Sequence, residues 1–360
     1  MTLCSAMIDR RRFLAAAGAG LAFPAAGCSD VEKRPVGNVP DSGFGAHATA
    51  EDVTQGIDLD GKLAIVTGCT SGIGFETMRV LALRGAYVVG TSRSLTRAED
   101  ACRDVIGITF PAQLDLGDFD SVARFADVVL QMRSPIDMLI CNAGYRGGGN
   151  QRQLVNGVEK HFAINHLGHF ILVNRLLARM SIADQGRVVV VASRTAYRDA
   201  PAQGILFEDL AMAGEYSDAM AYGHSKLANV LFSLKLADLL RGMRITSNAL
   251  HPGVIATGLS RNLSALSRLA WDAYVKLAGK TVAEGAATTC YVATSKNLAN
   301  ISGCYFEDCN AVTIHGQGHM QDKAMAERLL EASIGLTEDW LVEFRQPQPE
   351  DFEWPGREPD

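Results

Sequence analysis

The chain has 360 residues, 48% of them hydrophobic, and a formal charge of −6. This length and composition allow one large buried core and do not require two. The basic residues are scattered rather than gathered into a stripe, which argues against nucleic acid as a partner. The eight cysteines form no CxxC pair and no repeated ligand spacing, so we predict no metal site.

The first 28 residues have the composition of a targeting segment. Three arginines at 10–12 precede an uncharged apolar run, Phe13 to Ala26, that is too short to span a bilayer. The arginine pair resembles a twin-arginine export signal, and Cys28 resembles a bacterial lipoprotein site. The pattern predicts a signal peptide on an exported bacterial protein, periplasmic or anchored by a lipid on Cys28. A basic N-terminus on a cytoplasmic protein is the alternative.

Residues 29–58 are rich in Gly, Pro, Asp and Ala and are predicted to form a tether. From residue 59 onward, short apolar runs alternate with longer helical stretches. The predicted first helix covers 72–84, and the predicted strands are 63–67, 86–90, 108–110, 138–141, 188–191 and 244–250. Strands this apolar are typical of a parallel sheet buried on both faces.

The alternation of strands and helices predicts an α/β fold, a doubly wound parallel sheet of the Rossmann type in a single domain over 59–318. Residues 319–345 are predicted to form a C-terminal helical segment. Residues 346–360 hold four prolines and five acids and are predicted to be a disordered tail.

The loop between the first strand and the first helix is rich in glycine. Glycines there allow a tight turn and a close approach of the backbone to a pyrophosphate, which the helix N-terminus attracts. The spacing is wider than the common G-x-G-x-x-G, and an ordinary strand–helix turn can look the same. The candidate cofactor-binding residues of this loop are Gly68, Thr70, Ser71, Gly72, Ile73 and Gly74.

Tyr222 and Lys226 are four residues apart, which places both on one face of a predicted helix. A free tyrosine has a pKa of about 10 and is a poor base near neutrality. A lysine cation one turn away, together with an oxidised nicotinamide, favours the phenolate. Tyr222 is therefore predicted to exchange a proton with a substrate oxygen. Taken alone, such a pair is more often an exposed feature of a helix.

The glycine loop, Cys141-Asn142-Ala143-Gly144 and Tyr222-Gly223-His224-Ser225-Lys226 resemble the short-chain dehydrogenase/reductase superfamily in order and spacing. The surrounding sequence is more similar to the branch of retinol-dehydrogenase-like and WW-domain-containing oxidoreductases. This similarity covers residues 50–341 without a WW domain, and stretches 165–170, 225–232, 247–253 and 303–306 carry it. The resemblance implies hydride transfer between a nicotinamide cofactor and an alcohol or carbonyl compound.

The resemblance also implies roles for single residues. Asn165, Ser193, Tyr222 and Lys226 would form a catalytic tetrad, with Ser193 on the substrate oxygen and Asn165 holding a water that links Lys226 to solvent. Ala192-Ser193 stands where the family usually has Ser-Ser, and the second position is kept. The implied cofactor contacts are Asp115 and Leu116, Asn142, Ala143 and Gly144, Tyr222 and Lys226, and Pro252, Gly253 and Thr257.

The end of the second strand bears on the choice of cofactor. NAD enzymes place an acid about twenty residues after the glycine loop, whereas this chain has Arg93 and no acid before Glu99. A guanidinium flanked by serine hydroxyls suits a 2′-phosphate, so we predict NADP(H). Arg93 as a solvated residue, with NAD bound, is the alternative.

Residues 258–280 carry apolar side chains three and four positions apart, among them Leu263, Leu266 and Trp271. This spacing predicts an apolar helical face. In the superfamily such an insertion looks like a substrate lid, which favours a hydrophobic alcohol or carbonyl substrate. A core helix or a homodimer contact is the alternative. A dinucleotide-binding scaffold or redox-sensing protein without turnover is a second functional hypothesis, and the intact tetrad argues against it.

Overall fold

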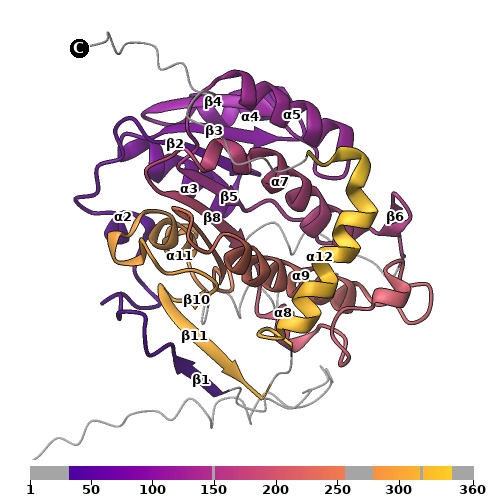
Figure 1. The fold of residues 1–360 in the computed structure, drawn as a ribbon. Helices are drawn as coiled ribbons and strands as arrows, with labels where there is room; N and C mark the ends of the chain where they lie inside the picture. Colours follow the sequence, from indigo (N-terminus) through magenta and orange to yellow (C-terminus); the bar gives the residue numbers. More distant parts are fainter. Residues whose placement is uncertain (1–31, 148–150, 256–278, 317–318, 343–360) are drawn as a thin grey trace, which may run out of the picture.

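The computed structural model describes residues 32–147, 151–255, 279–316 and 319–342. Within these residues a nine-stranded sheet runs through the molecule in the order β1-β11-β10-β9-β8-β5-β2-β3-β4 (Figure 1). The strands from β10 to β4 pair in parallel, and β11 and β1 are antiparallel to their neighbours. The sheet consists of β1 (Glu32–Pro35), β2 (Leu63–Thr67), β3 (Tyr87–Ser92), β4 (Ile108–Gln113), β5 (Met138–Cys141), β8 (Gly186–Val191), β9 (Ile245–His251), β10 (Tyr305–Glu307) and β11 (Asn310–His315). A separate hairpin joins β6 (Leu154–Val155) and β7 (Val158–Glu159).

Helices cover both faces of the sheet (Figure 1). One face packs against α2 (Ala50–Val53), α3 (Gly72–Leu83), α4 (Leu95–Arg103) and α11 (Val282–Thr294). The other packs against α5 (Phe119–Gln131), α7 (Gly168–Met180) and α9 (Asp218–Leu239), with α12 (Lys323–Thr337) lying on α9. Two short helices, α6 (Lys160–Phe162) and α8 (Thr195–Arg198), flank the cavity described below. None of the helices in the described ranges is long and apolar enough to cross a membrane.

The predicted doubly wound parallel sheet in a single domain is confirmed. Strands β2, β5, β8 and β9 are buried along their whole length. This burial explains the nearly unbroken apolar sequences of β2, β5 and β8. The structure extends β3 to Ser92, β4 to Gln113 and β9 to His251, beyond the predicted ends. These added residues are less apolar because they lie at the sheet edge or at the crevice above the strands.

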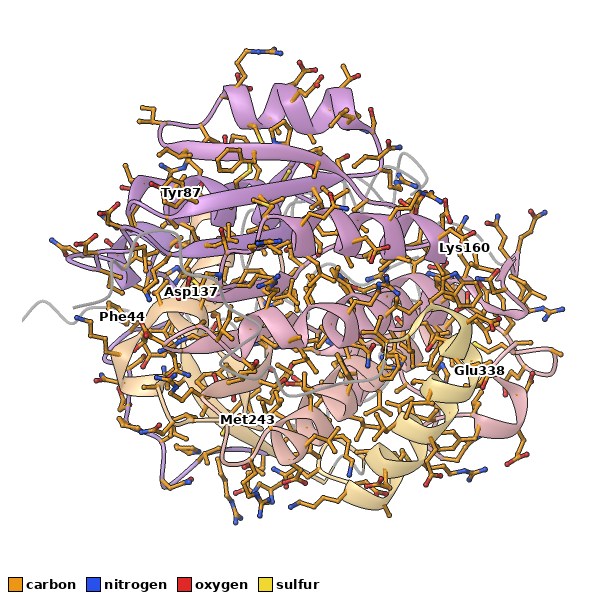
Figure 2. All side chains as sticks on the ribbon, turned by 45° about the horizontal axis from the view of Figure 1, so that its top comes forward. Phe44, Tyr87, Asp137, Lys160, Met243 and Glu338 are labelled. Carbon is orange, nitrogen blue, oxygen red and sulfur yellow. The ribbon has the colours of Figure 1, made fainter. Side chains whose placement is uncertain are left out.

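The prediction of a tether over 29–58 is wrong for the part that the structure describes. β1 pairs with β11, and α2 buries Ala50 and Val53 in the core. Between them Phe44, labelled in Figure 2, lies beside α11 and meets the ring of Tyr291 edge-on, with 6.0 Å between ring centres. A few anchors separated by Gly and Pro attach this segment, and such irregular spacing gives no periodic signal in the sequence.

We predict that Val53→Ala destabilises the protein by about 1.5 kcal/mol or more, because two buried carbons leave the core and a small cavity remains. The free energy of unfolding from urea titration measures this. Val128→Ala on α5 is the matched control, since Val128 is 60% exposed. Equal stabilities of the two variants would show that the N-terminal segment does not contribute to the core.

Candidate active site

The glycine loop connects β2 to α3 at the carboxyl ends of the parallel strands. The strand order reverses between β2 and β5, which is where doubly wound sheets form their ligand crevice. Gly68 has a φ of +73°, and a Cβ on Gly74 would lie 2.2 Å from the carbonyl oxygen of Gly68. Ser71, at the N-cap of α3, makes no side-chain cap hydrogen bond. The first N–H groups of α3 are therefore suited to bind an anion, such as a pyrophosphate.

A chain of buried hydrogen bonds fixes the loop after β5 beside the glycine loop. The Thr67 hydroxyl accepts from the N–H groups of Asn142 and Ala143, at 2.9 Å each. The Nε2 atom of His169 is 3.0 Å from the same hydroxyl, and its Nδ1 atom is 3.0 Å from the carbonyl oxygen of Asn165. Burial lowers the pKa of His169 to about 4, so its ring is neutral. Because Nδ1 must donate to the carbonyl, Nε2 accepts from Thr67.

Three of the four predicted catalytic residues line one cavity of about 490 Å³. Tyr222 and Lys226 lie one turn apart on α9, and Ser193 follows β8. Tyr222 and Ser193 face this same cavity, and Ser193 Oγ also accepts from the N–H of Thr195 at 3.2 Å. The Lys226 ammonium lies 5.7 Å from the centre of the Tyr222 ring and donates to the carbonyl of Val191 at 2.9 Å. Asn142, Gly144, Pro252 and Gly253, predicted to contact the cofactor, line the same cavity.

Asn165 lies in a π-helical turn, Ala163–Leu167, that leads into α7. Its Oδ1 accepts from the N–H of Tyr145 at 2.6 Å, and its Nδ2 donates to the Tyr145 carbonyl at 3.0 Å and to Ser225 Oγ at 2.9 Å. These contacts bind the loop after β5 to α9. π-Helical turns are frequent at functional sites. The implied link from Asn165 through a water to Lys226 stays a prediction.

Burial is the largest influence on the pKa values of the two predicted catalytic residues of α9, Tyr222 and Lys226. It lowers the pKa of Lys226 to about 8, against an opposing effect of Cys141. It raises the pKa of Tyr222, while Arg146 and the hydrogen bond from Ser193 lower it. Arg146 is thus a cation close to Tyr222 that was not predicted from the sequence. The predicted effect of Lys226, together with an oxidised nicotinamide, on the phenolate stays a prediction.

The predicted 2′-phosphate site lies next to the glycine loop. The N–H groups of Gly68 and Cys69 both donate to the Thr91 carbonyl at 3.0 Å, which ties the loop to the end of β3. Arg93 follows two residues later and is exposed. Its carbonyl accepts from Gln113 at the end of β4, at 3.1 Å.

The remaining predicted cofactor contacts are placed less completely. Asp115 lies just beyond β4, and one of its carboxylate oxygens accepts from the N–H of Gly117 at 2.9 Å. Leu116 is buried in the core below it. Thr257 lies outside the described residues, as do residues 256–278, which include nearly all of the predicted lid.

Several residues of the cavity were not predicted from the sequence. They are Tyr145 and Arg146 after β5, Arg194, Arg198 and Asp199 around α8, and His251 at the end of β9. The available signal was their position, since Arg146 follows the Asn-Ala-Gly motif by two residues and Arg194 directly follows Ser193. That signal is weak, because a basic side chain in a loop is ordinarily solvated.

The family model for short chain dehydrogenase matches residues 62–205. The chain is 40% identical over 315 residues to the chloroplastic short-chain dehydrogenase TIC 32 A of Brassica napus, covering 84% of this chain and 97% of that protein. It is 36% identical over 295 residues to retinol dehydrogenase 11 of Mus musculus, covering 80% and 90%. A solved structure of an uncharacterized protein from Mycobacterium paratuberculosis superimposes with a TM-score of 0.64 at 32% identity, covering 81% and 98%.

The chain therefore belongs to the short-chain dehydrogenase/reductase superfamily. Within it, the chain belongs to the branch that holds the retinol dehydrogenases and the WW domain-containing oxidoreductase. It is an oxidoreductase of a family that binds nicotinamide dinucleotides.

The prediction of an exported bacterial protein, periplasmic or anchored by a lipid at Cys28, is wrong. The chain's most similar curated relatives include a chloroplastic dehydrogenase and mammalian retinol dehydrogenases, not exported bacterial enzymes. A basic start followed by a short apolar run is common to several kinds of targeting segment, so the pattern does not identify a destination. Residues 1–31 lie outside the described residues.

We predict that Lys226→Met stabilises the protein at pH 7 while it impairs catalysis. A pKa of about 8 in place of 10.5 means that the buried ammonium costs on the order of 3 kcal/mol, from which about 1 kcal/mol is subtracted for the lost hydrogen bond. The cost is fully present below pH 8 and disappears as the pH rises to about 10.5, because the folded protein releases its proton first.

Thermal and urea unfolding at pH 7 and pH 10 measure this difference between wild type and variant. The advantage of Lys226→Met should shrink at the higher pH. Lys296→Met, at an exposed lysine, should show no such advantage. A Lys226→Met protein that is less stable than wild type at pH 7 would contradict the claim that the buried Lys226 ammonium destabilises the fold.

Proposed function

We propose that this protein is an NADP(H)-dependent oxidoreductase that transfers a hydride between the cofactor and a small alcohol or carbonyl compound. The observation that carries the proposal is the meeting of Tyr222, Lys226 and Ser193 in one cavity beside the glycine loop. The glycine loop fits a dinucleotide because Gly74 allows no side chain and α3 begins without a side-chain cap. A dinucleotide-binding protein without turnover is the competing hypothesis.

The residues of the cavity divide the work of proton transfer. The hydroxyls of Ser193 and Tyr222 line one cavity and would bind the substrate oxygen together. Tyr222 gives or takes the proton at that oxygen. Lys226, with a pKa of about 8, exchanges protons readily near neutral pH and lies next to Tyr222 on the same helix face. When bound, the nicotinamide supplies or accepts the hydride, and its oxidised form adds positive charge that favours the phenolate.

Arg93 supports NADP(H) over NAD(H). It is exposed at the end of β3, which the Thr91 carbonyl ties to the glycine loop, and no acid stands beside it in the sequence. A ribose 2′-phosphate bound there would take charge-assisted hydrogen bonds from the guanidinium. The prediction of a hydrophobic substrate rested on residues 258–280 and remains a separate, untested part of the proposal.

We predict that Tyr222→Phe lowers turnover of NADPH-dependent reduction by about two to four orders of magnitude, the usual contribution of a positioned acid–base group. Folding, followed by circular dichroism, and NADP(H) binding should persist because only a hydroxyl is lost. Tyr87→Phe is the matched control and should retain full activity. Tyr87, labelled in Figure 2, is the first residue of β3, at the end of the strand away from the cavity. Wild-type turnover in Tyr222→Phe would rule out this mechanism.

Arg93→Ala should weaken NADPH binding by about tenfold or more while affecting NADH far less, because a charge-assisted hydrogen bond contributes about 1.5–3 kcal/mol. Fluorescence titration of both cofactors measures the two dissociation constants. Arg103→Ala removes the same charge from the far end of α4, where Arg103 pairs with Asp100, and should change neither constant. Equal losses for both cofactors in Arg93→Ala would mean that Arg93 does not contact the phosphate.

A further inference from the structure

The side of the cavity beyond Tyr222 is unusually rich in arginine. Arg146 enters it from the loop after β5, and Arg194 and Arg198 enter it from α8 and its N-cap. The same cavity wall contains one described carboxylate, Asp199. A guanidinium that lines a cavity can bind an anionic group of a ligand, so the partners of each arginine are considered in turn.

Arg194 has a partner within the protein. It donates to the buried carboxylate of Glu307 at 3.1 Å, and Tyr197 donates its hydroxyl to the same side chain at 3.1 Å. This group forms the wall where α8 meets β10. Arg194 is therefore a structural residue of the cavity.

Arg146 and Arg198 have no ion-pair partner within 4.0 Å in the described residues, and both are exposed to the cavity solvent. The guanidinium of Arg146 lies 4.7 Å from the centre of the Tyr222 ring. Its charge thus lies over the ring whose hydroxyl would bind the substrate oxygen. A group attached to the substrate a few bonds from that oxygen comes within reach of this guanidinium.

Asp199 shows how a carboxylate behaves at this place. Burial raises its pKa, and Arg198 and Arg146 both oppose that effect although neither forms an ion pair with it. Arg198 and Arg146, which come from separate segments, therefore both lower the pKa of the same carboxylate in the cavity. With one carboxylate against two guanidiniums, the pair retains one uncompensated positive charge.

His251 supplies an independent sign that this cavity can bind a polar ligand. It is 5% exposed and lines the same cavity at the end of β9. Neither ring nitrogen has a hydrogen-bond partner among the described residues. Burial keeps the pKa of His251 well below its ordinary value, so the neutral ring offers one donor and one acceptor. Buried polar atoms without a partner are rare and commonly belong to binding sites.

We propose that the substrate is a carbonyl or hydroxy compound that also carries a carboxylate, and that Arg146 and Arg198 bind this carboxylate. The inference rests on the proposed function. A carboxylate suits this place because its two oxygens accept paired hydrogen bonds from a planar guanidinium. In the reduction, the carbonyl carbon takes the hydride from NADPH, and the oxygen takes the proton of Tyr222, which solvent restores. NADP+ and the hydroxy acid leave, and the carboxylate is unchanged.

The test compares aryl and alkyl keto acids, such as 4-oxo-4-phenylbutanoate, with their methyl esters as substrates for NADPH oxidation. Wild-type enzyme should have a kcat/KM for the acid about tenfold or more above that for the ester. Arg146→Gln and Arg198→Gln should each lower this acid-to-ester ratio by about tenfold. The ratio cancels any general loss of activity. Arg241→Gln, which removes the same charge from the pair with Asp238 at the far end of α9, should leave the ratio unchanged.

Equal kcat/KM values for acid and ester in wild type, or a ratio that the two variants leave unchanged, would overturn the carboxylate site and leave the proposed function intact. If no compound is reduced, the proposed function fails. Calorimetric titration of the NADP-bound protein with the same acids and esters then tests the carboxylate site separately. Binding of the acids alone, lost in Arg146→Gln, would support the carboxylate site. Binding of neither form would overturn it.

Discussion

The hydroxyl of Thr67 is the contact on which the whole site depends. It ends β2, accepts hydrogen bonds from the loop after β5 and donates to His169, which in turn binds the carbonyl of Asn165. The strand under the cofactor and the helix that carries Asn165 are thereby joined through buried, satisfied bonds. Such networks specify one arrangement strongly, because every unpaired member would be costly. Asn165 extends the network to α9, because its side chain donates to Ser225 Oγ.

Catalysis and stability make opposite demands on α9. A lysine ammonium with 3% exposure costs free energy, and the fold tolerates it because Lys226 binds the Val191 carbonyl and the sheet around it is buried on both faces. The same burial raises the pKa of Tyr222, so that the phenolate depends on cations brought close to it. The large apolar core thus provides the stability that offsets the cost of a few buried charges at the cavity.

The sequence predicted the elements that have a regular apolar pattern and missed the elements that are attached by isolated contacts. Strands such as 63–67 and 138–141 were found with their correct ends because continuous burial leaves an unbroken apolar run. β1, β11 and the anchors Phe44 and Val53 were missed because isolated contacts leave no period. The candidate residues were found through motifs of fixed spacing. Arg146 and His251 were not assigned roles, since their significance lies in which distant segments they meet, and one sequence does not contain that information.

The N-terminal strand has a consequence for the order in which the protein assembles. Lys33 of β1 forms an ion pair with Glu307, the same carboxylate that binds Arg194 in the cavity wall, across a separation of 274 residues. Contacts so distant in the chain close the largest loops and form late. The strands from β2 to β5 and their helices emerge from the ribosome together and need no such closure. The glycine loop therefore forms early during biogenesis, and the cavity wall around Glu307 is complete only when β1 and β11 have met.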